Sequence, residues 1–477
     1  MDSFVITGGR PLRGTVRING AKNACLPLMA CALLTDQPVT LRNVPNLSDS
    51  RIMQRLRDSL GCALSTAKPR AEQSEAPDQP VTNSLTLHAQ DHSKIVAHYD
   101  IVRTMRAGIC VLGPLLASRG KAKVSMPGGC AIGDRPVDLH LRGLEALGAT
   151  ITLDAGYIVA ETPQGGRRKG ANIFLGGPNG STALGTANVM SAAVLAEGTT
   201  VIECAACEPE IEDVGRLLIA MGAKITGLGS PRITIEGVES LHGTPTEGHT
   251  VLPDRIEAGT YLMAAAITHG DVVLENFPTD TLGAALDRLR EIGVTIESVG
   301  SEQWGGGSGE EKSASSIVAP SLAPAPTSSP PLPTAHPDTV RVAVARRLNP
   351  VQVVTQPHPG FPTDLQAQIM ALLTLADGNA IVTEKIFPDR FLHVAELLRM
   401  GAHITRVGNS AMITGVRELV GAPVMASDLR ASAGLVIAAL AARGQTQINR
   451  VYHLDRGYEQ MEVTLQGLGA EIERVSE

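Results

Sequence analysis

A short motif that recurs six times constrains the fold more than any other feature of the sequence. Each copy is an apolar residue, a glycine and a small residue; it closes a helix-like stretch and precedes a strand-like one, as in ALGATIT and RMGAHIT. Glycine adopts a left-handed backbone without strain, so each copy is predicted to end a helix at the C′ position. The repetition predicts a fold of six similar units. The glycines are Gly61, Gly148, Gly222, Gly293, Gly401 and Gly469.

Upstream of each glycine lies a helix-like run made almost wholly of small and aliphatic residues. The six runs are ACLPLMACALL, RAGICVLGPLL, ANVMSAAVLA, AGTYLMAAAIT, AQIMALLTLA and ASAGLVIAALA. A helix that is apolar on all sides cannot lie on a surface, so these runs are predicted to be central helices packed closely through Ala and Gly. Close packing of this kind explains why aromatic residues make up only 3% of the chain. We therefore expect an α/β fold with helices inside and sheets outside.

Length and charge exclude several classes of protein. A chain of 477 residues suggests two domains or more. The net charge of −7 gives no reason to expect nucleic acid, and no Lys/Arg run marks a membrane-surface patch. The start, MDSFVITGG, lacks the pattern of a signal peptide, and no apolar run approaches the roughly 18 residues of a spanning helix. These features predict a cytoplasmic protein.

Seven cysteines without regular spacing are expected to be free thiols. Cys204 and Cys207 form a CxxC pair, but a second pair is missing, so no metal site is expected there. Two segments interrupt the repeat, at residues 301–338 and at about residues 67–82. Both are rich in Ala, Pro and polar residues, and both are predicted to be disordered surface loops without catalytic function.

Several of the buried helices begin with charged residues. Helix N-termini offer free N–H groups and a positive dipole end, so an added Lys or Arg creates an anion site. Helix capping is the alternative explanation for the aspartates, and for Asp428 it explains the sequence equally well; for Lys22 and Arg106 the alternative is a solvated charge. A solvated charge fits poorly at the entrance of a buried helix, which favours anion binding. The residues are Lys22, Asn23, Arg103, Arg106, Asp254, Arg255, Asp364, Asp428 and Arg430.

The loop MPGGCAIGDRPVDLH places one cysteine, Cys130, among glycines that let the backbone approach a ligand. A lone cysteine is most often a small buried hydrophobe. Here Arg135 and a following helix N-terminus would lower the thiol pKa from its free value of roughly 8.5. Asp134 is a possible cap for that helix, and Pro136 suits its first turn. The loop therefore predicts a reactive thiol beside an anion-binding site.

Together these motifs resemble the UDP-N-acetylglucosamine 1-carboxyvinyltransferase family of enolpyruvyl transferases. The resemblance rests on INGAKNA, TMRA, PGGCAIGDRPVDLH, EPEI, LPDRIEAGT, FPTDLQAQ, SDLRASA and YHLDRGYE, and it runs from about Phe4 to Glu473. It implies a two-domain inside-out α/β barrel with three repeated units in each domain. One domain would comprise residues 1–20 and 250–477, the other residues 21–249 with the Cys130 loop. The active site would lie in the cleft between them.

The family transfers the carboxyvinyl group of phosphoenolpyruvate to the 3-hydroxyl of UDP-N-acetylglucosamine and releases phosphate, which requires no cofactor or metal. The resemblance implies that Cys130 is the proton donor and the residue alkylated by fosfomycin, and that Asp364 is the base. Asp428 and Arg430 would organise the reacting centre. Phosphoenolpyruvate would be held by Lys22, Arg135 and Arg456, with Asn23 beside it. The implied nucleotide-sugar contacts are Arg106, Arg135, Pro136, Val137, Asp138, Leu139, Thr182, Ala183 and Ile386.

The chain departs from the family pattern near the nucleotide contacts. Leu184 stands where a glycine is usual, and Gly180 stands where some members have lysine. Three hypotheses follow. The first is an active transferase of this family, which the cysteine, the base and the cations favour. The second is an enzyme with another acceptor such as shikimate 3-phosphate, which the cysteine loop disfavours, and the third is a catalytically silent paralogue that binds nucleotide sugar and regulates a partner. Phosphate release with both substrates present distinguishes the first from the third.

Overall fold

The computed structural model describes residues 2–65, 83–128, 137–163, 168–299, 338–344 and 347–476. Three segments named above lie outside the described residues: the insertion at about 67–82, residues 129–136 of the Cys130 loop, and residues 301–337 of the second insertion. Asp338, which we assigned to that insertion, instead begins a strand. Within the described part of the chain, no helix is long and apolar enough to cross a membrane.

The described strands form six four-stranded sheets of one shared design. In each sheet the first strand runs parallel to the second, and the other neighbours are antiparallel. Three sheets lie in residues 39–250. The first, in strand order, is β14 (His249–Thr250), β3 (Val39–Arg42), β5 (Leu85–Ala89) and β4 (Cys62–Ser65), and the second is β6 (Val96–Ala97), β7 (Lys121–Ser125), β9 (Tyr157–Glu161) and β8 (Thr150–Asp154). The third is β10 (Asn172–Phe174), β11 (Thr199–Glu203), β13 (Arg232–Glu236) and β12 (Lys224–Thr226).

Two of the other three sheets combine the two ends of the chain, and the third is built from residues 352–414 alone. Strand β1 lies between β23 and β24, with Ser3 opposite both Asn449 and Val475, so the termini are neighbours in one sheet. In strand order these sheets are β2 (Arg13–Arg17), β15 (Asp271–Phe277), β17 (Asp338–Ala343) and β16 (Thr295–Ser298); β18 (Gln352–Val354), β19 (Asn379–Thr383), β21 (Ser410–Thr414) and β20 (His403–Val407); and β22 (Pro423–Met425), β23 (Gln445–Asn449), β1 (Ser3–Thr7) and β24 (Glu471–Val475).

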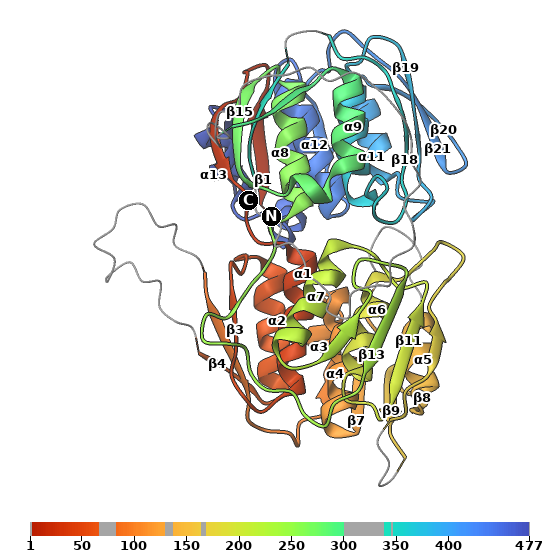
Figure 1. Ribbon diagram of the computed structural model, residues 1–477. Helices are drawn as coiled ribbons and strands as arrows, with labels where there is room; N and C mark the ends of the chain where they lie inside the picture. Colours follow the sequence, from red (N-terminus) through yellow and green to blue (C-terminus); the bar gives the residue numbers. More distant parts are fainter. Residues whose placement is uncertain are drawn as a thin grey trace, which may run out of the picture.

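The six apolar runs form buried helices, as predicted, and the sheets lie outside them (Figure 1). These helices are α1 (Lys22–Cys31) with η1 (Ala32–Leu34), η3 (Arg106–Val111) with α4 (Leu112–Arg119), α6 (Ala183–Ala193), α8 (Arg255–Ile267), η5 (Thr363–Leu365) with α10 (Gln366–Leu373), and α12 (Leu429–Ala441). Helices α8, α10 and α12 pack against one another, and α4 packs against α6.

A second helix in each unit is amphipathic and ends just before a repeat glycine. All six glycines have positive φ, from +75° to +106°, and each is followed within two residues by a strand. The predicted C′ role is confirmed for five of them, and Gly293 is itself the C-cap of its helix. These helices are α2 (Ser48–Ser59), α5 (Asp138–Ala146), α7 (Pro209–Ala220), α9 (Gly283–Ile292), α11 (Leu392–Arg399) and α13 (Met461–Gly467), and shorter pieces are α3 (Tyr99–Val102), η4 (Thr279–Thr281) and η6 (Val451–Arg456).

The buried apolar side chains divide into two clusters, which are the lower and upper bodies of Figure 1. The cluster here called the first core runs from Ala21 to Val251. The second core combines Phe4–Ile18 with Ile256–Ile472. The chain thus passes from one core to the other twice, near residue 20 and near residue 252.

The two crossings run side by side. Gly20 pairs with Pro253, the N–H of Ala21 donates to Leu252 at 2.7 Å, and the N–H of Asp254 donates to Asn19 at 2.8 Å. A Cβ at Gly20 would lie 1.8 Å from a backbone oxygen of the first core. The crossing is packed too closely for any side chain, so glycine is required there.

Candidate active site

A buried carboxylate joins the two cores beside the crossings. Asp49, in the first turn of α2, accepts from the Lys22 ammonium at 2.8 Å and from Arg456 Nε at 3.0 Å. Lys22 opens α1 of the first core, whereas Arg456 ends η6 of the second core. The pair Lys22–Asp49 is shielded from water and its electrostatics are strong, whereas the Arg456 side chain is 28% exposed. Two cations from different halves of the chain thus share one anion.

The protonation of this group depends on burial and on the charges together. Burial lowers the pKa of Lys22 although Asp49 raises it, and Arg456 and Arg430 lower it further. For Asp49, burial raises the pKa, but Lys22 and Arg456 outweigh this and hold it below its usual range. An incoming anion would stabilise the charged form of Lys22. The cluster is therefore suited to binding phosphate or carboxylate groups.

A second carboxylate, Asp364 in η5, lies in a similar setting. Its Oδ1 accepts from Arg390 Nη1 at 2.9 Å, and its Oδ2 accepts from Arg430 Nη2 at 3.2 Å and from Asn23 Nδ2 at 3.3 Å. Arg430 also donates to the Tyr458 hydroxyl at 3.3 Å. Asn23 comes from α1, so this group also links the two cores. Burial raises the pKa of Asp364, but Arg430 and Arg390 outweigh this and hold it well below its usual range.

The structure distinguishes the two explanations of the aspartates, helix capping and a role in the site. Asp428 caps α12 by accepting from the N–H groups of Arg430 at 2.9 Å and Ala431 at 3.1 Å. Asp254 caps α8 in the same way, and its Oδ2 also accepts from the N–H of Lys22 at 3.2 Å. Asp364 makes no cap, because its oxygens face arginines and Asn23. Capping thus accounts for Asp428, and its catalytic role stays a prediction.

The predicted nucleotide contacts lie on neighbouring segments of the first core. Val137 precedes α5, and Asp138 and Leu139 begin it; Thr182 caps α6 through Gly185 N–H, and Ala183 begins that helix. Helices α5 and α6 pack together. Arg106 is the first residue of η3, which packs against α6 in the same core.

The turn before Thr182 approaches the second core. A Cβ at Gly180 would lie 3.2 Å from Pro357 Cγ, and the φ of Gly180 is +99°. The backbone conformation itself favours glycine there, which gives a physical reason for the missing lysine. Ile386 lies in the second core, where its N–H donates to Glu384. Cys130, Arg135 and Pro136 lie outside the described residues.

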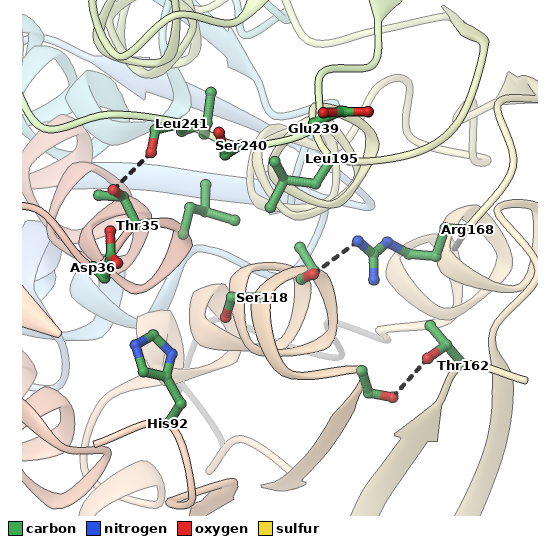
Figure 2. A pocket seen from close by; sticks show the side chains of 13 residues that line it. Thr35, Asp36, His92, Ser118, Thr162, Arg168, Leu195, Glu239, Ser240 and Leu241 are labelled. Atoms are coloured by element: carbon green, nitrogen blue, oxygen red, sulfur yellow. Dashed lines mark hydrogen bonds between the residues drawn. The ribbon is translucent and has the colours of Figure 1, made fainter. Parts of the chain in front are cut away.

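A cavity of about 530 Å³ lies at the other end of the first core (Figure 2). The tails of its three buried helices line it, through Leu34, Ser118 and Leu195. Arg168 points toward the same region and donates to the Ala117 carbonyl at 2.8 Å, which covers the C-terminus of α4. The buried helices therefore begin at the core boundary and end at this cavity, which contains none of the predicted site residues.

Sequence reasoning missed two residues of the site. Asp49 has the signature of an ordinary acidic residue in the first turn of an amphipathic helix. Arg390 precedes α11 on a polar stretch, where it resembles a surface charge, yet it is only 6% exposed. Neither position carries a local signal of its partner. In the described part of the chain, no cluster of His, Cys, Asp or Glu is arranged to hold a metal ion.

Comparison with known proteins places this arrangement in a family. The family model for EPSP synthase (3-phosphoshikimate 1-carboxyvinyltransferase) matches residues 6–465. Proteins named UDP-N-acetylglucosamine 1-carboxyvinyltransferase from Magnetococcus marinus, Sphingopyxis alaskensis and Rhodopseudomonas palustris are 46%, 48% and 49% identical, and 100% of each chain is covered.

Two solved structures share the fold. The enolpyruvyl transferase NikO from Streptomyces tendae is 22% identical with a TM-score of 0.80, covering 100% of this chain and 99% of that one. EPSP synthase from Acinetobacter baumannii is 17% identical with a TM-score of 0.69, covering 100% of both chains. The predicted enolpyruvyl transferase fold is therefore confirmed. Together with the full-length relatives, this shows that the chain belongs to the enolpyruvyl transferase family, in its UDP-N-acetylglucosamine 1-carboxyvinyltransferase group.

Proposed function

We propose that this chain transfers the carboxyvinyl group of phosphoenolpyruvate to the 3-hydroxyl of UDP-N-acetylglucosamine, a step of peptidoglycan precursor synthesis. The observation that carries the proposal is full-length identity of 46–49% to relatives that bear this enzyme's name. The fold and the charged groups at the core boundary agree with it. In this view the two cores are the two catalytic domains, divided near residues 20 and 250, and the reaction takes place between them.

Phosphoenolpyruvate would bind at the Asp49 cluster. Lys22 and Arg456 already converge on one carboxylate there, at 2.8 and 3.0 Å. A phosphate group carries more charge and more acceptor oxygens than a carboxylate, so it competes with Asp49 for both cations. Because the cations come from different cores, binding of the phosphate would also hold the two cores together. Arg135 would add a third cation to this site.

The sugar hydroxyl would be placed against Asp364. Two arginines hold this carboxylate ionised, so it can accept a hydrogen bond from the hydroxyl over the whole working range of pH. The same arginines make it a weak base. It would therefore take the proton only as the oxygen bonds to C2 of phosphoenolpyruvate, when the acidity of the hydroxyl rises steeply.

Cys130 would deliver the proton that the reaction requires at C3 of phosphoenolpyruvate. Addition then forms the C2–O bond to the sugar and converts the vinyl CH2 into a methyl group. In the elimination step the bond from C2 to the phosphate oxygen breaks, phosphate leaves, and the methyl group returns one proton. Cations around the phosphate stabilise the charge that develops on it. Asp428 and Arg430 would keep the acceptor side of the site in place.

The nucleotide sugar would bind along the segments that carry Arg106, Val137–Leu139 and Thr182–Ala183. Helices α5 and α6 hold the last two segments together in the first core. Pro136 would add a contact from the first domain, and Ile386 would complete the site from the second core. The sugar would thus contact both cores, as the reaction requires if its hydroxyl is to meet Asp364.

The test is phosphate release from phosphoenolpyruvate with and without UDP-N-acetylglucosamine, before and after treatment with fosfomycin. We expect sugar-dependent release that the drug abolishes, with one adduct at Cys130. Cys130→Ala should lose turnover and keep sugar binding in calorimetry, while Cys204→Ala, a matched control, should keep both. Sugar binding without phosphate release in the wild type would favour the silent paralogue instead.

A further inference from the structure

Glu384 is a fully buried carboxylate that no step of the proposed reaction uses. It follows β19 and accepts four hydrogen bonds. The donors are the Thr355 hydroxyl at 2.7 Å, the Thr363 hydroxyl at 2.9 Å, and the N–H groups of Ile386 at 2.7 Å and Phe387 at 2.9 Å. Burying a carboxylate is costly unless its oxygens accept hydrogen bonds, and these four donors offset that cost.

The two oxygens of Glu384 serve different segments. Its Oε1 accepts from Thr355, at the end of β18, and from the N–H groups of Ile386 and Phe387. The Thr355 hydroxyl in turn accepts from the N–H of Lys385 at 2.9 Å. This oxygen therefore fixes the turn after β19, which carries the predicted nucleotide-sugar contact Ile386.

The second oxygen, Oε2, leads toward Asp364. It accepts from the Thr363 hydroxyl, and the same hydroxyl accepts from Arg390 Nη1 at 3.0 Å. Arg390 Nη1 also donates to Asp364 Oδ1 at 2.9 Å. Thr363 directly precedes Asp364 in η5. The second oxygen therefore fixes both the turn that carries Asp364 and one of the arginines that bind it.

We propose that Glu384 is a positioning residue that holds the nucleotide-sugar contact at Ile386 in register with the reacting carboxylate at Asp364, one carboxylate oxygen serving each. The inference rests on the proposed function and assigns a separate role in it to each carboxylate oxygen of Glu384. Oε1 governs how well the sugar is held, and Oε2 governs how well its hydroxyl is placed for reaction.

Two isosteric variants separate the two oxygens. Thr355→Val removes a hydrogen bond on the Oε1 side, so the KM for UDP-N-acetylglucosamine should rise about tenfold while kcat stays within about twofold. Thr363→Val removes the link to Arg390 and Asp364, so kcat should fall about tenfold while KM stays within about twofold. A merely structural role would not produce this opposite split.

Glu384→Gln changes both sides at once. An amide has one acceptor oxygen, and its NH2 group would face a donor on one side, so KM should rise and kcat should fall together. Glu418→Gln is the matched control, because Glu418 is an exposed partner of Arg443 on the surface and should behave as the wild type. Thermal melting of each variant reports folding, and the threonine pair decides the question if Glu384→Gln does not fold.

Steady-state phosphate release measures all four variants. The opposite split of Thr355→Val and Thr363→Val supports the proposal. Equal changes in KM and kcat for both threonine variants, or a folded Glu384→Gln with wild-type parameters, would overturn it. A wild-type protein that releases no phosphate would overturn the proposed function itself, which is a different result from an active wild type with unsplit variants.

Discussion

The two halves of this molecule use one architecture but begin their buried helices differently. In the first core, α1 and η3 begin with the cations Lys22 and Arg106, and neither helix is capped by the residue that precedes it. In the second core, α8 and α12 follow Asp254 and Asp428, and each aspartate caps two N–H groups. The backbone repeat is the same, but in the second core an aspartate caps each of these helices ahead of the arginine in its first turn, Arg255 in α8 and Arg430 in α12.

This difference suggests a division of work between the cores. Cations at helix ends that the preceding residue does not cap favour anions, so the first core suits phosphate-bearing substrates. In the second core, carboxylates cover helix ends or, at Asp364, hold arginines in place. The contact Lys22–Asp49–Arg456 joins the two arrangements. The repeat thus supplies a scaffold, and the residues at the helix entries supply the chemistry.

Among the effects expected without a change of pH, the largest comes from Asp49→Asn, which removes the anion shared by the two cores. Buried Lys22 and partly exposed Arg456 would each lose their ion pair with Asp49, so the free energy of unfolding should fall by about 3 kcal/mol in urea denaturation. Inorganic phosphate should restore more stability to this variant than to the wild type. Asp154→Asn is the control, since Asp154 pairs with Lys123 at the surface. Equal responses to phosphate would contradict an anion site between the cores.

The pH dependence of stability tests the buried carboxylates of the second core. Burial and Asp254 raise the pKa of Glu257 to about 8, against two opposing hydrogen bonds from Asn19. The unfolded chain ionises near 4.5, so the stability held by the protonated form is complete below that pH and is lost as pH rises through about 8.

Glu257→Gln cannot ionise, so its stability relative to the wild type should increase with pH, by at most about 1.4 kcal/mol per pH unit, between those two values. Urea denaturation at several pH values across this range measures the difference. Glu236→Gln, at an exposed carboxylate, should show no such trend. A flat difference for Glu257→Gln would mean that Glu257 is ionised in the folded protein.

Removing helix caps in the two cores should change the stability by a smaller amount. Asp428→Ala removes two hydrogen bonds from a buried cap and should cost about 1.5 kcal/mol. Thr182→Ala, in the first core, removes one bond of 3.2 Å and should cost about 0.5 kcal/mol. Thermal unfolding of the two variants gives the ranking. The opposite order would show that the cores do not differ in how their helix ends are stabilised.

The smallest effect tests what the cores have in common. Gly148 and Gly401 both have positive φ, and a Cβ at either would meet no atom within 4 Å. Each change to Ala should therefore cost only backbone strain, about 1 kcal/mol, and the two costs should add in the double variant. Calorimetric melting measures them. Unequal costs would show that the two repeats are not equivalent.

The sequence was sufficient for the scaffold because its determinants are local. A run of small apolar residues forms a buried helix wherever it stands, and a glycine at C′ ends a helix through its own φ. The six runs and the six glycines therefore predicted the repeat, and the relatives confirmed its family. The same local rules could not separate Asp364 from Asp428, because an aspartate at a helix entry satisfies both explanations.

Only the tertiary structure decided the partners of the charged residues. Asp49 and Arg456 are 407 positions apart, and Asn23 and Asp364 are 341 apart, so no local pattern connects them. Glu384 has no sequence signal at all, since its four donors come from three segments. Helices and turns follow from neighbours along the chain, whereas a buried carboxylate is defined by the donors that folding brings to it. The sequence by itself therefore determined the six-unit scaffold, and tertiary contacts decided which charges meet.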